Sequence, residues 1–229
     1  MITTNDAPPT VIAICGSERS GGNTDLLLEY ATRRFAQHSI VMTTIHLRDE
    51  GVSGPCGPCG DCNTRERPCT VPDGVASVVQ RMRNADGILY GTPVHGFGTA
   101  GLMQQFIERS GVGFLRFDRP LANKVAGVVV TGRRFSLEHA YTQIVNNILL
   151  NRMILAGSGF PALVRGGAPG SGLQDEEGLR SLDSTVNRMA GLLHYFKEGR
   201  RCGVDETFLE LPQINERQVF SAERKDAAG

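Results

Sequence analysis

The chain has 229 residues, enough for one large domain or two small ones. Its 24 basic and 24 acidic residues balance, so the composition indicates neither a nucleic-acid nor a membrane-surface partner. No apolar run approaches the ~20 residues that a membrane helix needs, and residues 1–10 lack the basic and apolar regions of an export signal. We therefore expect a cytoplasmic protein whose six cysteines serve metals or redox chemistry.

The first predicted elements are a buried strand, a polar loop and a helix. Residues 11–15 form a continuous apolar run that is typical of a parallel strand buried on both faces, with Cys15 packed inside it. The loop 16–24 follows, and a helical segment covers about 25–38. Asn23 has the side chain of a helix cap.

This loop has the chemistry of a phosphate site. Its backbone N–H groups and the N-terminus of the next helix favour a dianion. Ser17 and Thr24 add hydroxyls, and Arg19 adds a full positive charge. An ordinary polar turn is the alternative. Because no Gly-Lys-Ser/Thr sequence follows, the loop is not a Walker loop.

A cysteine-rich stretch follows the second predicted strand, which covers residues 40–47. It runs from Pro55 to Cys69 and is rich in proline and glycine, which prevents a helix. Its cysteines are Cys56, Cys59, Cys62 and Cys69. Short gaps between thiolates are typical of iron–sulfur clusters. Zinc, a loop without metal, and redox-active or disulfide-bonded thiols remain alternatives.

Two further predicted elements lead to a second glycine-bearing loop, and a third follows it. A helix covers 74–85 and a buried strand covers 87–91. The loop 92–101 then precedes a helix that carries Leu102, Met103, Phe106 and Ile107. Residues 96–101 formally match the dinucleotide fingerprint Gly-x-Gly-x-x-Gly. That fingerprint belongs to the first strand–helix turn of a Rossmann unit, so we do not expect it to act as one here.

The last predicted elements complete an alternating α/β pattern. A strand covers 125–131, a helix covers about 136–154, and a short strand covers 161–165. The core face of that helix is predicted to be Leu137, Tyr141, Ile144, Ile148 and Leu149. A final helix carries an apolar stripe formed by Leu179, Leu182, Val186, Met189, Leu193 and Phe196.

This pattern predicts a doubly wound, five-stranded parallel sheet. We expect a single domain over residues 1–204, with the cysteine loop at about 53–72, and a polar C-terminal tail over 205–229. In such sheets ligands bind outside the carboxyl ends of the strands, where the loops after the first, third and fourth strands converge.

The loop motifs resemble those of a known group of flavoproteins. Residues 16–24, Gly-Ser-Glu-Arg-Ser-Gly-Gly-Asn-Thr, resemble the Gly-Ser-x-Arg-x-x-Gly-Asn-Thr loop of the flavodoxin-like NAD(P)H-dependent FMN reductase superfamily. Thr92-Pro93-Val94, followed by Gly101, Phe106, Ile107 and Arg109, resembles its second flavin loop and the helix after it. With the cysteine run between these motifs, residues 10–155 look most like the iron-sulfur flavoprotein branch of that superfamily.

The resemblance implies FMN as cofactor. Its phosphate would be held by Ser17, Arg19, Asn23 and Thr24. The isoalloxazine would lie against the second loop, formed by Thr92, Pro93, Val94, His95, Gly96, Phe97 and Gly98. The third loop, formed by Thr131, Gly132 and Arg133, would close over the ring.

The resemblance also implies a [4Fe–4S] cluster on Cys56, Cys59, Cys62 and Cys69. It further implies a homo-oligomer, either a dimer or a tetramer, that brings cluster and flavin together. NAD(P)H or a ferredoxin-like protein would be the external electron donor or acceptor.

This chain departs from the family pattern at the flavin. His95 and Gly96 stand where aromatic residues are common, with Phe97 one place later. Phe135 and Ser136 replace the glycine pair that is usual near the third loop.

The chain is thus predicted to be a redox protein in which electrons pass between the cluster and FMN. We identify no side-chain nucleophile or general base, and His95 is the one candidate proton donor. Two alternatives remain open: an NAD(P)H-dependent FMN or quinone reductase without a cluster, and a flavin or redox sensor without turnover.

Overall fold

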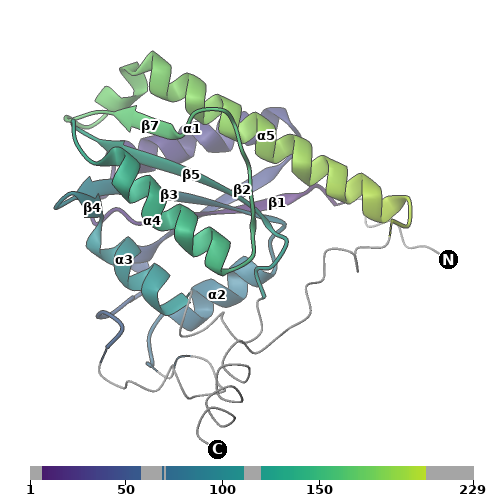
Figure 1. Cartoon of the computed structure of the whole chain (residues 1–229), viewed down its shortest axis with the longest axis horizontal. Coiled ribbons are helices and arrows are strands. Elements are labelled where there is room, and N and C mark those ends of the chain that lie inside the picture. The colour runs from purple at the N-terminus through teal and green to yellow at the C-terminus, as the bar shows by residue number, and fades with distance from the viewer. Residues whose placement is uncertain (1–6, 58–68, 70, 111–119, 205–229) are drawn as a thin grey trace, which may run out of the picture.

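A parallel β-sheet runs through the centre of the molecule and carries helices on both faces (Figure 1). The computed structural model describes residues 7–57, 69, 71–110 and 120–204. The strands are β1 (Thr10–Cys15), β2 (Val41–His46), β3 (Gly87–His95), β4 (Gly98–Thr99), β5 (Val125–Gly132), β6 (Ile154–Leu155) and β7 (Ala162–Arg165). The helices are α1 (Asn23–Gln37), α2 (Val75–Arg83), α3 (Gly101–Glu108), α4 (Leu137–Leu150) and α5 (Glu176–Arg201), with short 3-10 helices η1 (Leu47–Asp49) and η4 (Ser171–Gln174).

The strand order confirms the predicted doubly wound, flavodoxin-like sheet. The order is β2-β1-β3-β5-β6, with β7 also paired to β5, and all of these pairings are parallel. The predicted fifth strand, 161–165, corresponds to β7, which pairs with the end of β5 from Val129 to Gly132. β6 was not predicted, and it pairs with the start of β5 at Val125 and Ala126.

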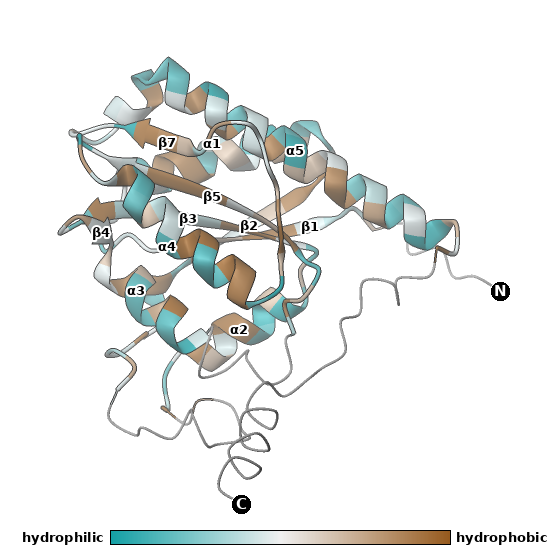
Figure 2. Ribbon diagram, viewed as in Figure 1, coloured by the Kyte–Doolittle hydropathy of each residue, from teal (hydrophilic) through white to brown (hydrophobic). Residues whose placement is uncertain are grey.

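Two hydrophobic clusters, one on each face, hold this sheet between its helices. One cluster joins the sheet to α2, α3 and α4 through residues such as Met82, Phe106 and Ile148. The other joins it to α1 and α5 through residues such as Phe35 and Met189. The apolar residues concentrate along the central strands β3 and β5, as expected for parallel strands that are buried on both faces (Figure 2).

Helix α4 differs from its prediction. It ends at Leu150 rather than near residue 154, and Leu149 is 59% exposed, so its assignment to the core face was wrong. The buried position is taken instead by Asn147, whose Nδ2 donates to the Ile107 carbonyl at 3.1 Å. Hydrophobicity alone could not predict a buried amide that hydrogen-bonds to a backbone carbonyl of a neighbouring helix.

Strand β3 also extends further than predicted. Instead of stopping at Gly91 it continues to His95 and turns back into β4, with which it forms a short antiparallel pair. Part of the predicted second loop is therefore a β-hairpin.

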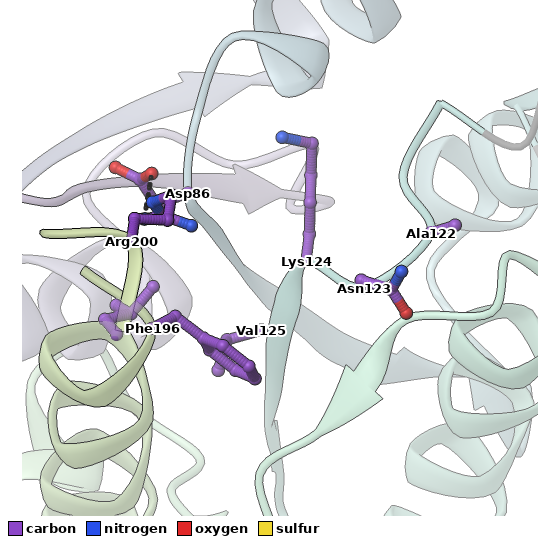
Figure 3. A pocket seen from close by; sticks show the side chains of 8 residues that line it. Asp86, Ala122, Asn123, Lys124, Val125, Phe196 and Arg200 are labelled. Carbon is purple, nitrogen blue, oxygen red and sulfur yellow. Dashed lines mark ion pairs between the residues drawn. The ribbon is translucent and has the colours of Figure 1, made fainter. Parts of the chain in front are cut away.

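Some predicted features lie outside the described residues, namely Cys59, Cys62 and the 205–229 tail. None of the described helices combines the length and the apolar character required to cross a membrane. A hollow at the amino ends of β3 and β5 is lined by Lys124 and by the ion pair of Asp86 and Arg200 (Figure 3). Because it lies at the amino ends of the strands, it is remote from the loops that follow them.

Candidate functional site

The loops after β1 and β3 meet at the carboxyl edge of the sheet, where the chain leaves toward one face after β1 and toward the other face after β3. β1 and β3 are adjacent and parallel, and their following helices α1 and α3 pack on opposite faces. The Gly16 N–H donates to the Gly91 carbonyl at 2.8 Å. A β-carbon on Gly16 would lie 2.6 Å from Cβ of Met103, so only glycine lets the first loop approach α3 this closely. This is the topological switch point at which doubly wound sheets bind ligands.

The predicted phosphate loop lies directly above the N-terminus of α1. Ser17 is buried, and its hydroxyl bonds both the N–H and the carbonyl of Arg19, at 3.2 and 3.0 Å. The Arg19 side chain is exposed, whereas Thr24 is buried in the first helical turn.

The prediction that Asn23 caps α1 was wrong. Gly22 occupies the cap position in an extended conformation, and no described side chain caps the helix there. Asn23 is the first helical residue, and its amide instead donates to the Ala168 carbonyl at 2.9 Å and accepts from the Gly172 N–H at 3.2 Å. The backbone between Gly166 and Gly172 satisfies both halves of this amide, which the local sequence around Asn23 could not show. The first N–H groups of α1 thus remain available for an anion.

The 166–172 segment after β7 lies between the third predicted loop and the phosphate loop, and the Asn23 amide holds it there. Gly166 follows β7, and its N–H donates to the Gly132 carbonyl at 3.0 Å. A β-carbon on Gly166 would lie 2.9 Å from Nδ2 of Asn23. Nearby, Arg133 is exposed and packs against Gly167. The structure thus brings Gly132, Arg133 and the 166–172 segment to the phosphate loop.

The second predicted loop is a tight hairpin. Gly96 and Phe97 both have a positive φ, 53° and 69°, which is costly for Phe97 because it has a β-carbon. The Phe97 side chain is 71% exposed at the tip of the turn. At the base of the hairpin, the buried Thr92 hydroxyl accepts from the Ala100 N–H at 3.3 Å.

Glu18 connects the first and second loops. One carboxylate oxygen accepts from the Leu102 N–H at the start of α3, at 3.3 Å. The other lies 3.3 Å from Nδ1 of His95. Sequence reasoning missed Glu18 because its partners are more than 70 residues away in the chain.

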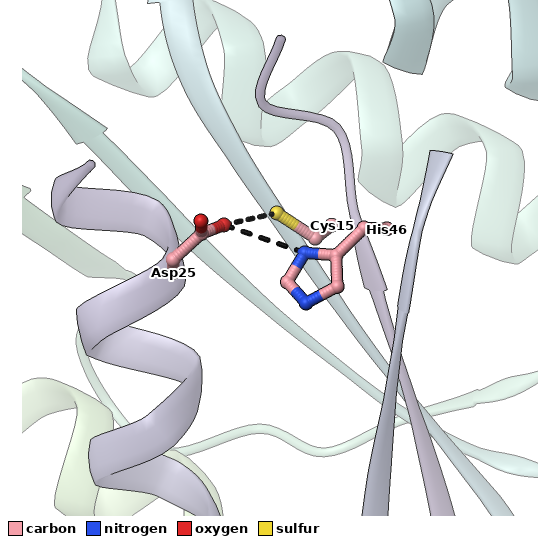
Figure 4. Close-up of side chains that lie close together, drawn as sticks. All are labelled: Cys15, Asp25 and His46. Carbon is pink, nitrogen blue, oxygen red and sulfur yellow. Dashed lines mark hydrogen bonds and ion pairs between the residues drawn. The ribbon is translucent and has the colours of Figure 1, made fainter. Parts of the chain in front are cut away.

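A polar cluster lies beneath the phosphate loop. The Asp25 carboxylate accepts from the Cys15 thiol at 3.1 Å and lies 3.4 Å from Nδ1 of His46 (Figure 4). Arg48 donates to both carboxylate oxygens at 3.0 Å. Burial disfavours the charge on Asp25, but the hydrogen bonds from Arg48, Cys15 and the Gly21 N–H outweigh it and lower the pKa of the carboxyl. Asp25, His46 and Arg48 were not predicted as site residues.

Two of the four predicted metal ligands lie among the described residues, at the C-terminal end of α3. The Cys56 N–H donates to Glu108 at 3.2 Å. The Cys69 sulfur lies 3.9 Å from Nη2 of Arg109. The first and last cysteines of the run are therefore anchored by two consecutive residues of one helix end.

A buried ion pair closes the base of the cysteine loop. The side chains of Arg109 and Asp73 are 1% and 3% exposed and form a bidentate contact. Asp73 also accepts from the Ser53 N–H at 2.8 Å and from the Val75 N–H, at the start of α2, at 3.1 Å. Arg109 in turn donates to the Ser53 carbonyl at 3.2 Å.

This environment strongly shifts the titration of the pair. Burial opposes the charge on Asp73, but the hydrogen bonds from Arg109, Ser53 and Val75 dominate and lower its pKa to about 2. The hydrogen bond to Asp73 raises the pKa of Arg109.

Comparison with known proteins identifies the family. A model of the family described as NADPH-dependent FMN reductase matches residues 9–167. An iron-sulfur flavoprotein of Methanocaldococcus jannaschii is 33% identical over 195 residues, which covers 82% of this chain and 99% of the relative. An iron-sulfur flavoprotein of Methanosarcina thermophila is 25% identical over 194 residues, which covers 83% of this chain and 98% of the relative.

Solved structures agree with the fold. RosB, in complex with the intermediate 8-demethyl-8-formylriboflavin-5'-phosphate, has a TM-score of 0.69 at 15% identity, and the match covers 95% of this chain and 87% of RosB. At this identity the likeness shows the fold alone. The family model, by contrast, spans more than half of the chain, and the resemblance predicted from the loop motifs is confirmed. The chain belongs to the NADPH-dependent FMN reductase family of flavin-dependent oxidoreductases.

Proposed function

We propose that this oxidoreductase binds FMN with its phosphate at the N-terminus of α1, between Ser17, Arg19, Asn23 and Thr24. The observation that carries the proposal is the uncapped N-terminus of α1 beneath a glycine-bearing loop at the switch point of the sheet. Unpaired N–H groups and the helix dipole both favour a phosphate there. Bound FMN supplies one- and two-electron chemistry, and the protein positions it.

The isoalloxazine would lie against the hairpin residues Thr92, Pro93, Val94, His95, Gly96, Phe97 and Gly98. Thr131, Gly132 and Arg133 would border the ring from the next strand. The buried hydroxyl of Thr131 has no hydrogen-bond partner among the described residues, which suits a residue whose partner is a ligand. His95, held by Glu18, would be the group that supplies or accepts a proton at the ring.

We further propose that Cys56, Cys59, Cys62 and Cys69 hold a [4Fe–4S] cluster. The relatives named iron-sulfur flavoproteins support the presence of an iron–sulfur cluster. The anchored base of the loop supports it too, because the loop ends are held together by protein contacts alone. Helix α3 has eight residues, so ~12 Å separates its two ends, and it begins at the flavin hairpin and ends at the cysteines. One rigid element would therefore set the spacing between the two redox groups.

Electrons would pass between the cluster, FMN and an external partner, either NAD(P)H or a ferredoxin-like protein. A homodimer or homotetramer would bring the cluster and flavin of different subunits together. Gel filtration with light scattering on the anaerobically purified protein tests the oligomeric state.

Cofactor analysis of the fresh protein tests the central proposal. After anaerobic purification, we expect stoichiometric FMN together with four iron and four acid-labile sulfide per chain, as a [4Fe–4S] cluster requires. FMN without iron would reject the cluster and keep the flavin site. Iron without FMN would reject the flavin site.

A plain NAD(P)H-dependent FMN or quinone reductase is the second candidate. The description of the family model favours it, as does a Bacillus subtilis relative, a putative NAD(P)H-dependent FMN-containing oxidoreductase, at 32% identity over 100 residues, covering 43% of this chain and 50% of the relative. Iron and acid-labile sulfide analysis separates the two, because a plain reductase contains FMN and no iron. Rapid anaerobic mixing with NADH or NADPH bleaches the flavin of either enzyme and separates both from a sensor without turnover.

A further inference from the structure

An ion pair between the buried Asp25 and the largely buried Arg48 supports the phosphate loop from behind. Asp25 lies in the first turn of α1, and Arg48 lies in η1, after β2. Their side chains are 7% and 16% exposed, and the guanidinium contacts both carboxylate oxygens at 3.0 Å. Asp25 also accepts from the Gly21 N–H at 2.8 Å, which fixes the end of the loop.

Arg48 also determines which way the peptides of the loop point. Its Nη1 donates to the carbonyls of Ser17 and Arg19, at 3.4 and 3.2 Å. In a trans peptide the N–H points opposite to the carbonyl. With these two carbonyls turned toward Arg48, the N–H groups of Glu18 and Ser20 point away from it. A run of backbone N–H groups held in one direction forms an anion-binding concavity.

The charge of Asp25 makes Arg48 necessary. A buried carboxylate in the first turn of α1 would repel a phosphate dianion placed at the same helix end. The bidentate guanidinium neutralises this carboxylate, and the positive potential of the helix N-terminus is kept for the ligand.

From these contacts we propose that Arg48, paired with Asp25, is the positioning residue that makes this site select FMN over flavins without a phosphate. The inference rests on the proposed FMN site. It goes further by assigning the discrimination to a pair that lies behind the loop and does not touch the ligand.

A metal site is the competing interpretation of this cluster. One ligand atom from each of Cys15, Asp25 and His46 lies within 4.8 Å of the other two. However, both oxygens of Asp25 already accept from Arg48. Burial also raises the pKa of the Cys15 thiol to about 12, so the sulfur stays protonated and donates to Asp25, whereas a metal needs a thiolate. The contacts therefore favour a support for the loop.

The test compares FMN with riboflavin, which differ only in the phosphate. The full-length chain, freed of flavin, is titrated with each by flavin fluorescence. Arg48→Met removes the charge and the hydrogen-bond donors but keeps a side chain of similar length. We expect this change to weaken the binding of FMN at least about tenfold and to leave the binding of riboflavin unchanged. Asp25→Asn/Arg48→Met removes the uncompensated carboxylate as well, so it should regain part of the FMN affinity. Arg48→Lys keeps the charge but lacks the two-pronged guanidinium, so its affinity for FMN should lie between those of the wild type and Arg48→Met.

A matched control comes from a second ion pair formed by an arginine and an aspartate, in which α1 supplies the arginine. Arg34 lies in the last turn of α1, at the end away from the loop, and contacts Asp183 at 2.8 Å, with both side chains partly exposed. Arg34→Met should leave the ratio of FMN to riboflavin affinity unchanged.

The outcomes separate the two proposals. If Arg48→Met lowers both affinities equally, or neither, Arg48 has only a structural role and the inference is overturned while the FMN site stands. If the wild-type chain binds FMN no better than riboflavin, the phosphate site itself is wrong. Should Arg48→Met not fold, Arg48→Lys decides by the same ratio, with thermal unfolding as the folding check.

Discussion

Arg109 is the largest side chain that the described core buries completely. A buried guanidinium is costly to desolvate, and it is tolerated here because Asp73 and the Ser53 carbonyl satisfy most of its donors. The same group faces the Cys69 sulfur, so one residue both closes the cysteine loop and places a positive charge beside a proposed ligand. Local propensity predicts none of this, because a lone arginine at a helix end is usually solvated.

A double-mutant cycle should show that Arg109 and Asp73 act as a unit. Arg109→Met leaves a buried carboxylate unpaired and should lower the free energy of unfolding by ~3–5 kcal/mol. The double variant Arg109→Met/Asp73→Asn should lower the free energy of unfolding by clearly less than the sum of the two single changes. Urea unfolding measures both. The half-exposed Arg34–Asp183 pair is the control, with an expected coupling below ~1 kcal/mol. Additive effects at Arg109 and Asp73 would contradict the buried pairing.

The shifted carboxyl of Asp73 predicts a specific acid sensitivity. Its pKa is about 2 in the folded protein, against an ordinary value of 3.8. Because the pKa of Asp73 is lower in the folded than in the unfolded chain, the ionised carboxylate stabilises the folded state at pH values above the unfolded pKa. This contribution to stability is lost as the pH falls from about 4 to 2. The shift corresponds to ~2 kcal/mol. Unfolding by urea at several pH values should show a shallower loss between pH 4 and 2 in Asp73→Asn/Arg109→Met than in the wild type. Equal slopes would refute the shift.

At the scale of single elements, the β3–β4 hairpin and α3 form one unit. Gln143 of α4 fixes β4 by accepting from the Thr99 N–H at 2.9 Å, and Glu18 accepts from the first turn of α3. The tip of the hairpin nevertheless holds Phe97 in a left-handed conformation that glycine would adopt without strain. An exposed aromatic side chain kept at such a position is typical of a functional site.

Two substitutions at Phe97 should therefore separate stability from function. Phe97→Gly removes the strain and should raise the free energy of unfolding by ~1 kcal/mol relative to Phe97→Ala, which keeps a β-carbon at positive φ. Both should change the spectrum and potential of bound flavin alike, since both remove the ring. Thermal unfolding and flavin redox titration measure these effects. If neither variant alters the flavin, the ring does not contact Phe97, and His95 would be the next residue to test.

At the scale of the whole molecule, the cysteine loop is inserted between β2 and α2 and closed at its base. The Glu50 backbone lies against Gly74, where a β-carbon would come within 1.6 Å of the Glu50 carbonyl oxygen. This steric closure and the Asp73–Arg109 pair tie the loop to the sheet domain. Changes within the loop should therefore leave the flavin end of the molecule intact.

Cys69→Ser tests this separation. We expect FMN to be retained and the iron content to fall sharply, because the proposed ligand is lost while the loop base and the sheet are unchanged. Iron, sulfide and FMN analysis after anaerobic purification measures the outcome. Cys202→Ser, at the exposed end of α5, is the control and should keep full iron. Full iron in Cys69→Ser together with loss in Cys56→Ser would mean that another group is the fourth ligand.

The sequence by itself determined the fold class and the order of the glycine-bearing loops. Runs such as 11–15 and 125–130 contain no polar side chain, and this pattern is typical of parallel strands buried between two helical layers. The glycine-bearing loop 16–24 carries its chemistry within nine adjacent residues, so local sequence was enough to find it. The sequence predicted element ends less accurately, as the end of α4 at Leu150 and the extension of β3 to His95 show.

Only the tertiary structure decided how the loops are supported. Arg48 contacts Asp25 from η1, the Asn23 amide bonds a segment about 145 residues later, and Arg109 contacts Asp73 at the base of the cysteine loop. Each contact satisfies a buried charge or amide through a partner distant in the chain. Such pairs produce no periodic pattern in the sequence, and a single polar residue is predicted to be exposed because most polar residues are. Composition and spacing therefore locate the motifs, whereas the buried polar contacts that orient them depend on the packing of the whole sheet.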